Sequence, residues 1–151
     1  KRKQSQRELL RKFFIWGEKR KNNNLICQNP QFDYGFLSAK SRAYNLKFPF
    51  SHRCFDLHSI AGVIYFQING QFLIKDNNSD MGLRNILAFT GLKDERRSLE
   101  KGKVVIEGKP HNALEDAKLT AEAFSRLVYG RNLLPEYLSF PVPNYLKLKH
   151  D

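Results

Sequence analysis

Residues 24–37 of the chain, NLICQNPQFDYGFL, contain the pattern that decides the fold. The apolar run at the start is typical of a buried strand. Asn29-Pro30 is a helix-start signal, because Asn can cap a helix and Pro suits its first position. We therefore expect a strand that ends before Asn29 and a helix over residues 30–44. Asp33 then lies on the first turn of that helix, next to the C-terminal end of the strand.

Helices and strands alternate along the rest of the chain. We expect an amphipathic helix over 5–20, and a second strand in RCFDLHSIA (53–61) that runs into a helix. Asn69-Gly70 is a turn signal, residues 80–91 are predicted as a helix, and the residues around 93–103 as a polar loop. The strongest helix pattern covers 112–129. Strands separated by helices favour parallel pairing and an α/β fold. Two strands are too few for a parallel sheet, which is normally covered on both faces.

Length and composition narrow the class of protein. The 151 residues fit one domain, and a hydrophobic fraction of 41% excludes a disordered tail. We expect no membrane association, because there is no apolar run of about 18 residues and no secretory signal pattern. Cys27 and Cys54 both lie in apolar runs, which favours free thiols in a reducing compartment and a cytoplasmic location.

The excess of positive charge points to an anionic partner. Lys and Arg number 26 against 15 acids, giving a net charge of +11. Residues 1–21 contribute many of these cations, with only Glu8 and Glu18 opposing them. Such a field attracts the phosphates of nucleic acids. Solubility, contact with acidic lipid and a helix whose apolar stripe faces the core remain alternatives for this segment.

Three side chains are candidates for chemistry. Asp33 lies at the edge where parallel α/β sheets bind ligands, and a carboxylate there can hold Mg²⁺, although it can also merely stabilise the helix N-terminus. His111 and Asp116 lie at the start of the last helix. A histidine there can take a proton from water, or can be a surface residue. Asp116 stands beside Ala113 and Ala117, which we assign to the apolar face, so a ligand or metal could approach it closely.

Two of these segments together resemble a known superfamily. QNPQFDYGFL (28–37) is similar to the second motif of the DEDDh 3′–5′ exonucleases, and HNALEDA (111–117) is similar to their third. CFDLHSIA and MGLRNILAFTGL resemble the elements between these motifs, so the similarity spans about residues 9–130. The nearest type is ribonuclease T and the proofreading subunits of DNA polymerases. The resemblance implies a ribonuclease H-like fold, with residues 1–130 as the C-terminal part of an exonuclease domain and 131–151 as an arm, extended and packed on the domain or frayed.

The resemblance also implies roles for the candidate residues. Asp33 would help to hold one of two Mg²⁺ or Mn²⁺ ions, Asp116 would be a ligand of the other, and His111 would be the general base. The substrate would be a DNA or RNA 3′ end, and the product a nucleoside 5′-monophosphate. A homodimer or a complementing chain is a possible partner.

The sequence departs from the superfamily at its first motif, Asp-x-Glu. None of the aspartates is followed by Glu two positions later. We therefore expect a partial fold whose N-terminal strands are missing, and little or no activity from this chain alone. Two alternatives stay open. One is a non-catalytic nucleic-acid-binding module, and the other is a structural zinc site at His52, Cys54 and His58.

Overall fold

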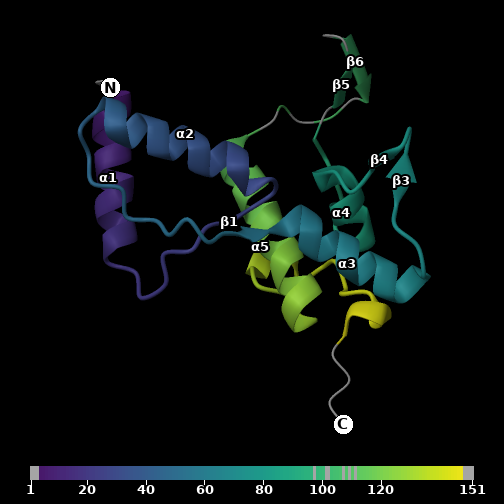
Figure 1. Ribbon diagram of the computed structural model, residues 1–151. Coiled ribbons are helices and arrows are strands. Elements are labelled where there is room, and N and C mark those ends of the chain that lie inside the picture. The colour runs from purple at the N-terminus through teal and green to yellow at the C-terminus, as the bar shows by residue number, and fades with distance from the viewer. Residues whose placement is uncertain are drawn as a thin grey trace. The chain divides into compact units, whose positions relative to one another are not determined.

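The computed structural model describes residues 4–147 except 97, 101, 102, 107, 109 and 111. The described chain is mixed α/β, with five α-helices and three two-stranded sheets. It divides into two units, Lys1–Asp56 and Leu57–Asp151. Figure 1 shows both units, with most of their helices and strands labelled.

The first unit begins with helix α1 (Gln6–Glu18). Ser5 caps it, since its Oγ accepts the backbone N–H of Glu8 at 3.2 Å. The buried face of α1 contains Phe14 and Gly17. Phe14 packs edge-on against the rings of Phe48 and Phe50, at centroid distances of 5.7 and 6.1 Å. The expected amphipathic helix is therefore present, and an aromatic cluster forms its inner contact.

A short parallel pair follows in the same unit. Strand β1 (Ile26–Cys27) pairs with β2 (Phe55–Asp56), with Cys27 opposite Asp56. Helix α2 (Pro30–Ala43) starts directly after β1 and has Pro30 in its first turn. The predicted strand, helix and parallel pairing are confirmed here. Asn29 stands at the N-cap position, as predicted, but it is left-handed (φ 58°) and its side chain makes no capping bond.

The second unit is built on helices α3 (Leu57–Asn69), α4 (Leu83–Phe89) and α5 (Ala113–Tyr129). Together with the C-terminal arm they enclose one apolar core, formed by Leu57, Ala61, Met81, Ile86, Leu87, Leu92, Leu119, Ala123, Leu127, Val142 and Leu146. Two short 3₁₀ turns, η1 (Pro135–Tyr137) and η2 (Asn144–Leu146), shape the arm. Because Val142 and Leu146 are buried, the described part of the arm packs on the unit.

Two antiparallel hairpins complete the second unit. Strands β3 (Ile74–Lys75) and β4 (Asn78–Ser79) pair around two residues with positive φ, Asp76 and Asn77, as tight hairpin loops require. The turn predicted at Asn69-Gly70 is instead the end of α3, where Gly70 adopts φ 71°. Strand β5 (Ser98–Glu100) lies inside the stretch predicted as a polar loop (93–103), and its partner β6 (Lys103–Ile106) begins at the last residue of that stretch, so the prediction is wrong there.

Candidate functional site

Acidic side chains gather at the C-terminal edge of the parallel pair in the first unit. Cys27 and Asp56 are the last residues of β1 and β2, and Asp33 lies in the first turn of α2. Besides burial, the carboxylates of Asp33 and Asp56 both raise the pKa of the Cys27 thiol. Burial raises the pKa of Cys27 to about 12, helped by the charge of Asp33, by Cys54, by a hydrogen bond with Asp33 and by the charge of Asp56. Asp33 and Asp56 therefore both lie within electrostatic reach of one sulfur atom.

The chemistry of this edge suits a hard cation. Mg²⁺ prefers oxygen ligands, and Asp33 and Asp56 bring carboxylate oxygens to the side of the pair where ligands bind in parallel sheets. The backbone N–H of Asn29 donates to Asp56 Oδ1 at 3.1 Å, which fixes one of these oxygens. Sequence reasoning gave Asp56 no role. Its position as the last strand residue before a helix was the available signal.

Asp116 is the second predicted ligand, and it is tied to an arginine. Arg96 Nη1 donates to Asp116 Oδ1 at 3.0 Å. On its other side, Arg96 donates to both oxygens of Asp94, at 2.8 Å from Nε and 3.0 Å from Nη2. The side chains of Arg96 and Asp94 are only 12% and 9% exposed, against 31% for Asp116. A divalent ion at Asp116 would therefore share this carboxylate with Arg96.

The electrostatics of Asp94 and Arg96 follow from this geometry. Burial acts to raise the pKa of Asp94, but the hydrogen bonds and charge of Arg96 outweigh it and lower the pKa below its usual value. The pKa of Arg96 is raised, chiefly by its hydrogen bonds to Asp94 and then to Asp116, against the effect of burial. Arg96 is thus held as a charged group between two carboxylates. The sequence gives no signal for Arg96, because nothing in a polar loop marks which cation is buried.

Helix α5 places Asp116 differently from the prediction. Asn112 caps the helix, its Oδ1 accepting the backbone N–H of Leu114 at 3.0 Å. Ala113 and Ala117 are exposed, so the apolar face assigned to them is wrong in the first turn. The buried face is an adjacent stripe formed by Leu119, Glu122, Ala123, Ser125, Arg126 and Leu127. Alanine is small enough to lie on either the exposed or the buried face of a helix. The larger apolar side chains therefore decide which face is buried.

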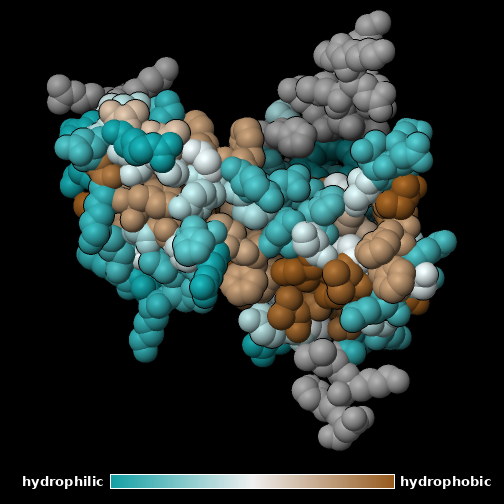
Figure 2. All heavy atoms as spheres, viewed as in Figure 1, coloured by the Kyte–Doolittle hydropathy of each residue, from teal (hydrophilic) through white to brown (hydrophobic). Residues whose placement is uncertain are grey.

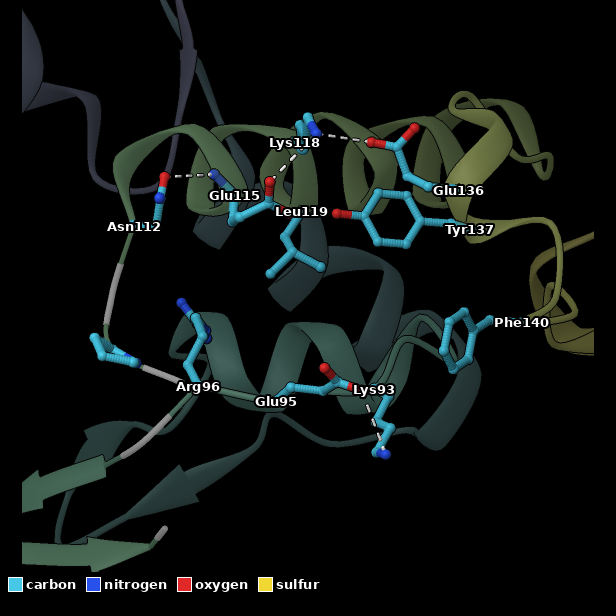
Figure 3. Close-up of a pocket in the computed structure, with 11 residues that line it drawn as sticks. Lys93, Glu95, Arg96, Asn112, Glu115, Lys118, Leu119, Glu136, Tyr137 and Phe140 are labelled. Atoms are coloured by element: carbon cyan, nitrogen blue, oxygen red, sulfur yellow. Dashed lines mark hydrogen bonds and ion pairs between the residues drawn. The ribbon is translucent and has the colours of Figure 1, made fainter. Parts of the chain in front are cut away.

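A pocket of about 460 Å³ lies on the second unit between α5, the segment after α4 and η1 (Figure 3). Leu119, Tyr137 and Phe140 supply its apolar lining. Two lysines that line the pocket form ion pairs with acidic side chains. Lys118 Nζ lies 3.0 Å from Glu136 and 3.3 Å from Glu115. Lys93 Nζ lies 3.4 Å from Glu95. Arg96 also lines the pocket, so the cavity reaches the guanidinium that holds Asp116.

The predicted site residues fall in different parts of the chain. Asp33 belongs to the first unit and Asp116 to the second, so their joint binding of two ions stays a prediction. His111 lies outside the described residues. Within the described residues, no three His, Cys, Asp or Glu side chains form a group able to hold a metal, and the suggested set His52, Cys54 and His58 is no exception. Cys27 and Cys54 are free and half-buried.

Comparison with known proteins adds no relative. No protein-family model, no curated protein and no solved structure matches the chain at a significant level. In the part of the chain that the structure describes, none of the helices has the length and apolar character needed to cross a membrane.

Proposed function

We propose that this chain is part of a metal-dependent 3′–5′ exonuclease of the DEDDh class, built on a ribonuclease H-like fold. The observation that carries the proposal is that Asp33 and Asp56, at the C-terminal edge of the β1–β2 pair, both interact with the Cys27 thiol. Carboxylates at this edge are the groups that hold Mg²⁺ for work on phosphates. The resemblance of residues 28–37 and 111–117 to two exonuclease motifs supplies the reaction.

Each residue has a role in this proposal. Asp33 and Asp56 would hold one Mg²⁺ or Mn²⁺, Asp116 would hold the other, and His111 would take a proton from the attacking water. When bound, two such ions stabilise the entering and leaving oxygens of a phosphodiester. The net charge of +11 attracts the nucleic-acid backbone. The sequence contains no Asp-x-Glu, so further carboxylates have to come from another segment or another copy, and the 151 residues alone are expected to show negligible turnover.

The test compares two proteins, the 151-residue chain and the same chain joined to the residues encoded immediately upstream of Lys1. Each is incubated with a single-stranded oligonucleotide and Mn²⁺, and nucleoside 5′-monophosphate is quantified by chromatography. The longer protein should release it from 3′ ends, and Asp33→Asn and Asp116→Asn should each reduce the release to background. Asp76→Asn, in the exposed β3–β4 loop, is the matched control, because Asn tolerates the same positive φ.

Two results would overturn the exonuclease assignment. One is the absence of monophosphate release from the longer protein. The other is release that Asp33→Asn and Asp116→Asn leave unchanged. An upstream segment without Asp-x-Glu would also remove two of the four carboxylates that the class requires.

A second candidate is a non-catalytic nucleic-acid-binding module with the same fold. The ion pair between Arg96 and Asp116 favours it, because the guanidinium occupies an oxygen that the metal would need. This candidate predicts oligonucleotide binding that weakens with salt and no turnover with any divalent ion.

A further inference from the structure

One flank of α1 carries exposed rings. Leu9, Phe13 and Trp16 lie three or four residues apart, so they are neighbours on the helix surface. Their exposed fractions are 52%, 37% and 52%. Phe13 and Trp16 stack with an interplanar angle of 13° and a centroid distance of 5.8 Å. Phe13 is anchored in turn on Phe50 at 5.0 Å. The rings are thus packed on one another while about half of the surface of Trp16 remains open to solvent.

Cations frame these rings. The Arg20 guanidinium lies 4.8 Å from the centre of the Trp16 ring, and its Nε donates to the Trp16 carbonyl at 3.4 Å. Among the described residues, no acidic side chain pairs with its two terminal nitrogens, so most of the five N–H donors of Arg20 are open to a ligand. Lys12 lies one turn before Trp16 and pairs with Glu8 at 3.4 Å. Leu9, Lys12, Phe13, Trp16 and Arg20 together form what we call the α1 flank.

The charge around the α1 flank is strongly positive. Residues 4–21 contain six Lys or Arg and two Glu. Glu8 pairs with Lys12 and Glu18 with Lys47, so both acids are already neutralised. The face of the first unit drawn in Figure 2 is largely hydrophilic, with hydrophobic residues interspersed. A field of this sign, with aromatic surface inside it, complements an anionic chain that also presents flat rings.

We propose that the α1 flank binds single-stranded nucleic acid, with a base on the open part of the Trp16 indole and phosphates at Arg20 and Lys12. Unpaired bases stack on aromatic rings whatever their identity, and arginine beside the ring adds contact to both base and phosphate. This inference rests on the proposed exonuclease function. It adds the place where the nucleic-acid strand that leads to the 3′ end is bound.

The same observations argue against a lipid surface as the occupant. A membrane-surface helix buries one wide apolar face in the bilayer interface. The apolar face of α1 that contains Phe14 and Gly17 is turned into the unit, where a Cβ on Gly17 would meet the Phe50 ring at 3.0 Å. On the α1 flank the cations Lys12 and Arg20 lie on either side of the two stacked rings along the chain, a combination that suits a ligand with both bases and phosphates.

The experiment measures binding in EDTA, without turnover. A fluorescein-labelled dT oligonucleotide is titrated with the 151-residue chain and followed by anisotropy, and an unlabelled one is followed by the emission of Trp16, the single Trp of the chain. Stacking should quench the indole. Arg20→Gln and Trp16→Leu should each weaken binding at least about five-fold, the lower end of the effect of one stacked base. Arg20→Gln keeps every ring, so it remains informative if Trp16→Leu disturbs folding.

The matched control is Lys40→Gln on α2, which removes the same charge. Lys40 also lies over an aromatic ring, that of Phe36, at 5.6 Å. The proposal predicts affinity close to that of the wild type for this variant. Equal losses from Lys40→Gln and Arg20→Gln, or binding without any change in Trp16 emission, would refute it. Quenching or a blue shift with phosphatidylserine vesicles but not with the oligonucleotide would assign the flank to lipid. Because no metal is present, these outcomes are independent of the exonuclease test.

Discussion

Arg126 Nε donates to Glu122 Oε1 at 2.9 Å across one turn of α5, and both side chains are completely buried. The remaining groups of the pair bind backbone. The partners are the carbonyls of Thr90, Tyr137 and Phe140 for Arg126 and the N–H groups of Leu133 and Leu134 for Glu122. Each nitrogen of the guanidinium and each oxygen of the carboxylate therefore has a hydrogen-bond partner. The pair fastens the C-terminal arm to the helix that carries Asp116.

Breaking this pair should strongly destabilise the second unit. Arg126→Met leaves the Glu122 charge buried without its partner, which typically costs about 3–5 kcal/mol. Urea unfolding followed by far-UV circular dichroism measures the loss. Lys118→Met is the control, because it removes an exposed cation from the same helix that also reaches the arm, through Glu136. Its cost should be much smaller, because ion pairs between exposed side chains contribute little to stability. Similar losses from the two variants would contradict a special role for the buried pair.

Replacing Arg96 should alter stability in a pH-dependent way. Arg96 holds the pKa of Asp94 below its usual value, so the folded state favours the charged carboxylate. This contribution is fully present above the unfolded pKa and is lost as the pH falls through the lower folded pKa. Arg96→Met should therefore cost about 1.5–3 kcal/mol near neutral pH, the range for hydrogen bonds to charged groups. The gap to the wild type should narrow as the pH falls below about 4.

Melting temperatures of both proteins from acid to neutral pH test this dependence. Arg84→Met is a graded control, since Arg84 Nε lies 3.6 Å from Asp94 and is more exposed. It should show the same trend with a smaller gap. A gap between wild type and Arg96→Met that stays constant with pH would show that the stabilisation comes from packing and not from charge.

The reactivity of Cys27 should report on Asp33. The thiolate is the nucleophile, and with its pKa raised to about 12 Cys27 should alkylate slowly at mildly basic pH. Asp33→Asn removes a negative charge and a charged hydrogen-bond acceptor, so the pKa should fall and the rate should rise about tenfold for each unit of that fall. Pulse labelling with iodoacetamide and mass spectrometry of the Cys27 peptide measures the rate. Asp76→Asn is the control, and an unchanged rate in Asp33→Asn would place Asp33 away from the thiol.

Local signals in the sequence were sufficient for most of the helices. Pro30 and Gly130 mark a helix start and a helix end, and the structure has α2 beginning at Pro30 and α5 ending before Gly130, which adopts φ 62°. Such signals depend on single-residue backbone preferences, which tertiary contacts seldom override. The parallel pairing of β1 and β2 followed from the helix between them.

Two kinds of feature were harder to predict: the choice between competing turn signals, and burial that depends on long-range contacts. Asp76 and Asn77 adopt positive φ in a hairpin loop, yet Asn69-Gly70 carried the stronger turn signal and ends a helix. Arg96 is one of many cations in the sequence. Its burial depends on a contact with Asp116, which lies 20 positions further along the chain. The motifs indicate Asp33, Asp116 and His111. They carry no information on Arg96, which donates a hydrogen bond to Asp116.

Gly17 offers a test of the aromatic cluster in the first unit, because two effects oppose each other there. Alanine inside a helix is normally favoured over glycine by about 1 kcal/mol. A Cβ on Gly17, however, would lie 3.0 Å from the Phe50 ring and 3.1 Å from Pro49. Overpacking a close contact typically costs about 1–3 kcal/mol, so Gly17→Ala should destabilise the unit on balance.

Gly35→Ala is the matched control for this prediction. Gly35 lies inside α2 of the same unit, and a Cβ there would meet nothing within 4 Å. The substitution should stabilise the unit by about 0.5–1 kcal/mol. Denaturant unfolding followed by Trp16 emission reports on both variants, since the indole stacks on Phe13 and Phe13 packs on Phe50. If Gly17→Ala stabilises the unit as much as Gly35→Ala does, Phe50 does not pack against α1 as tightly as the 3.0 Å approach requires.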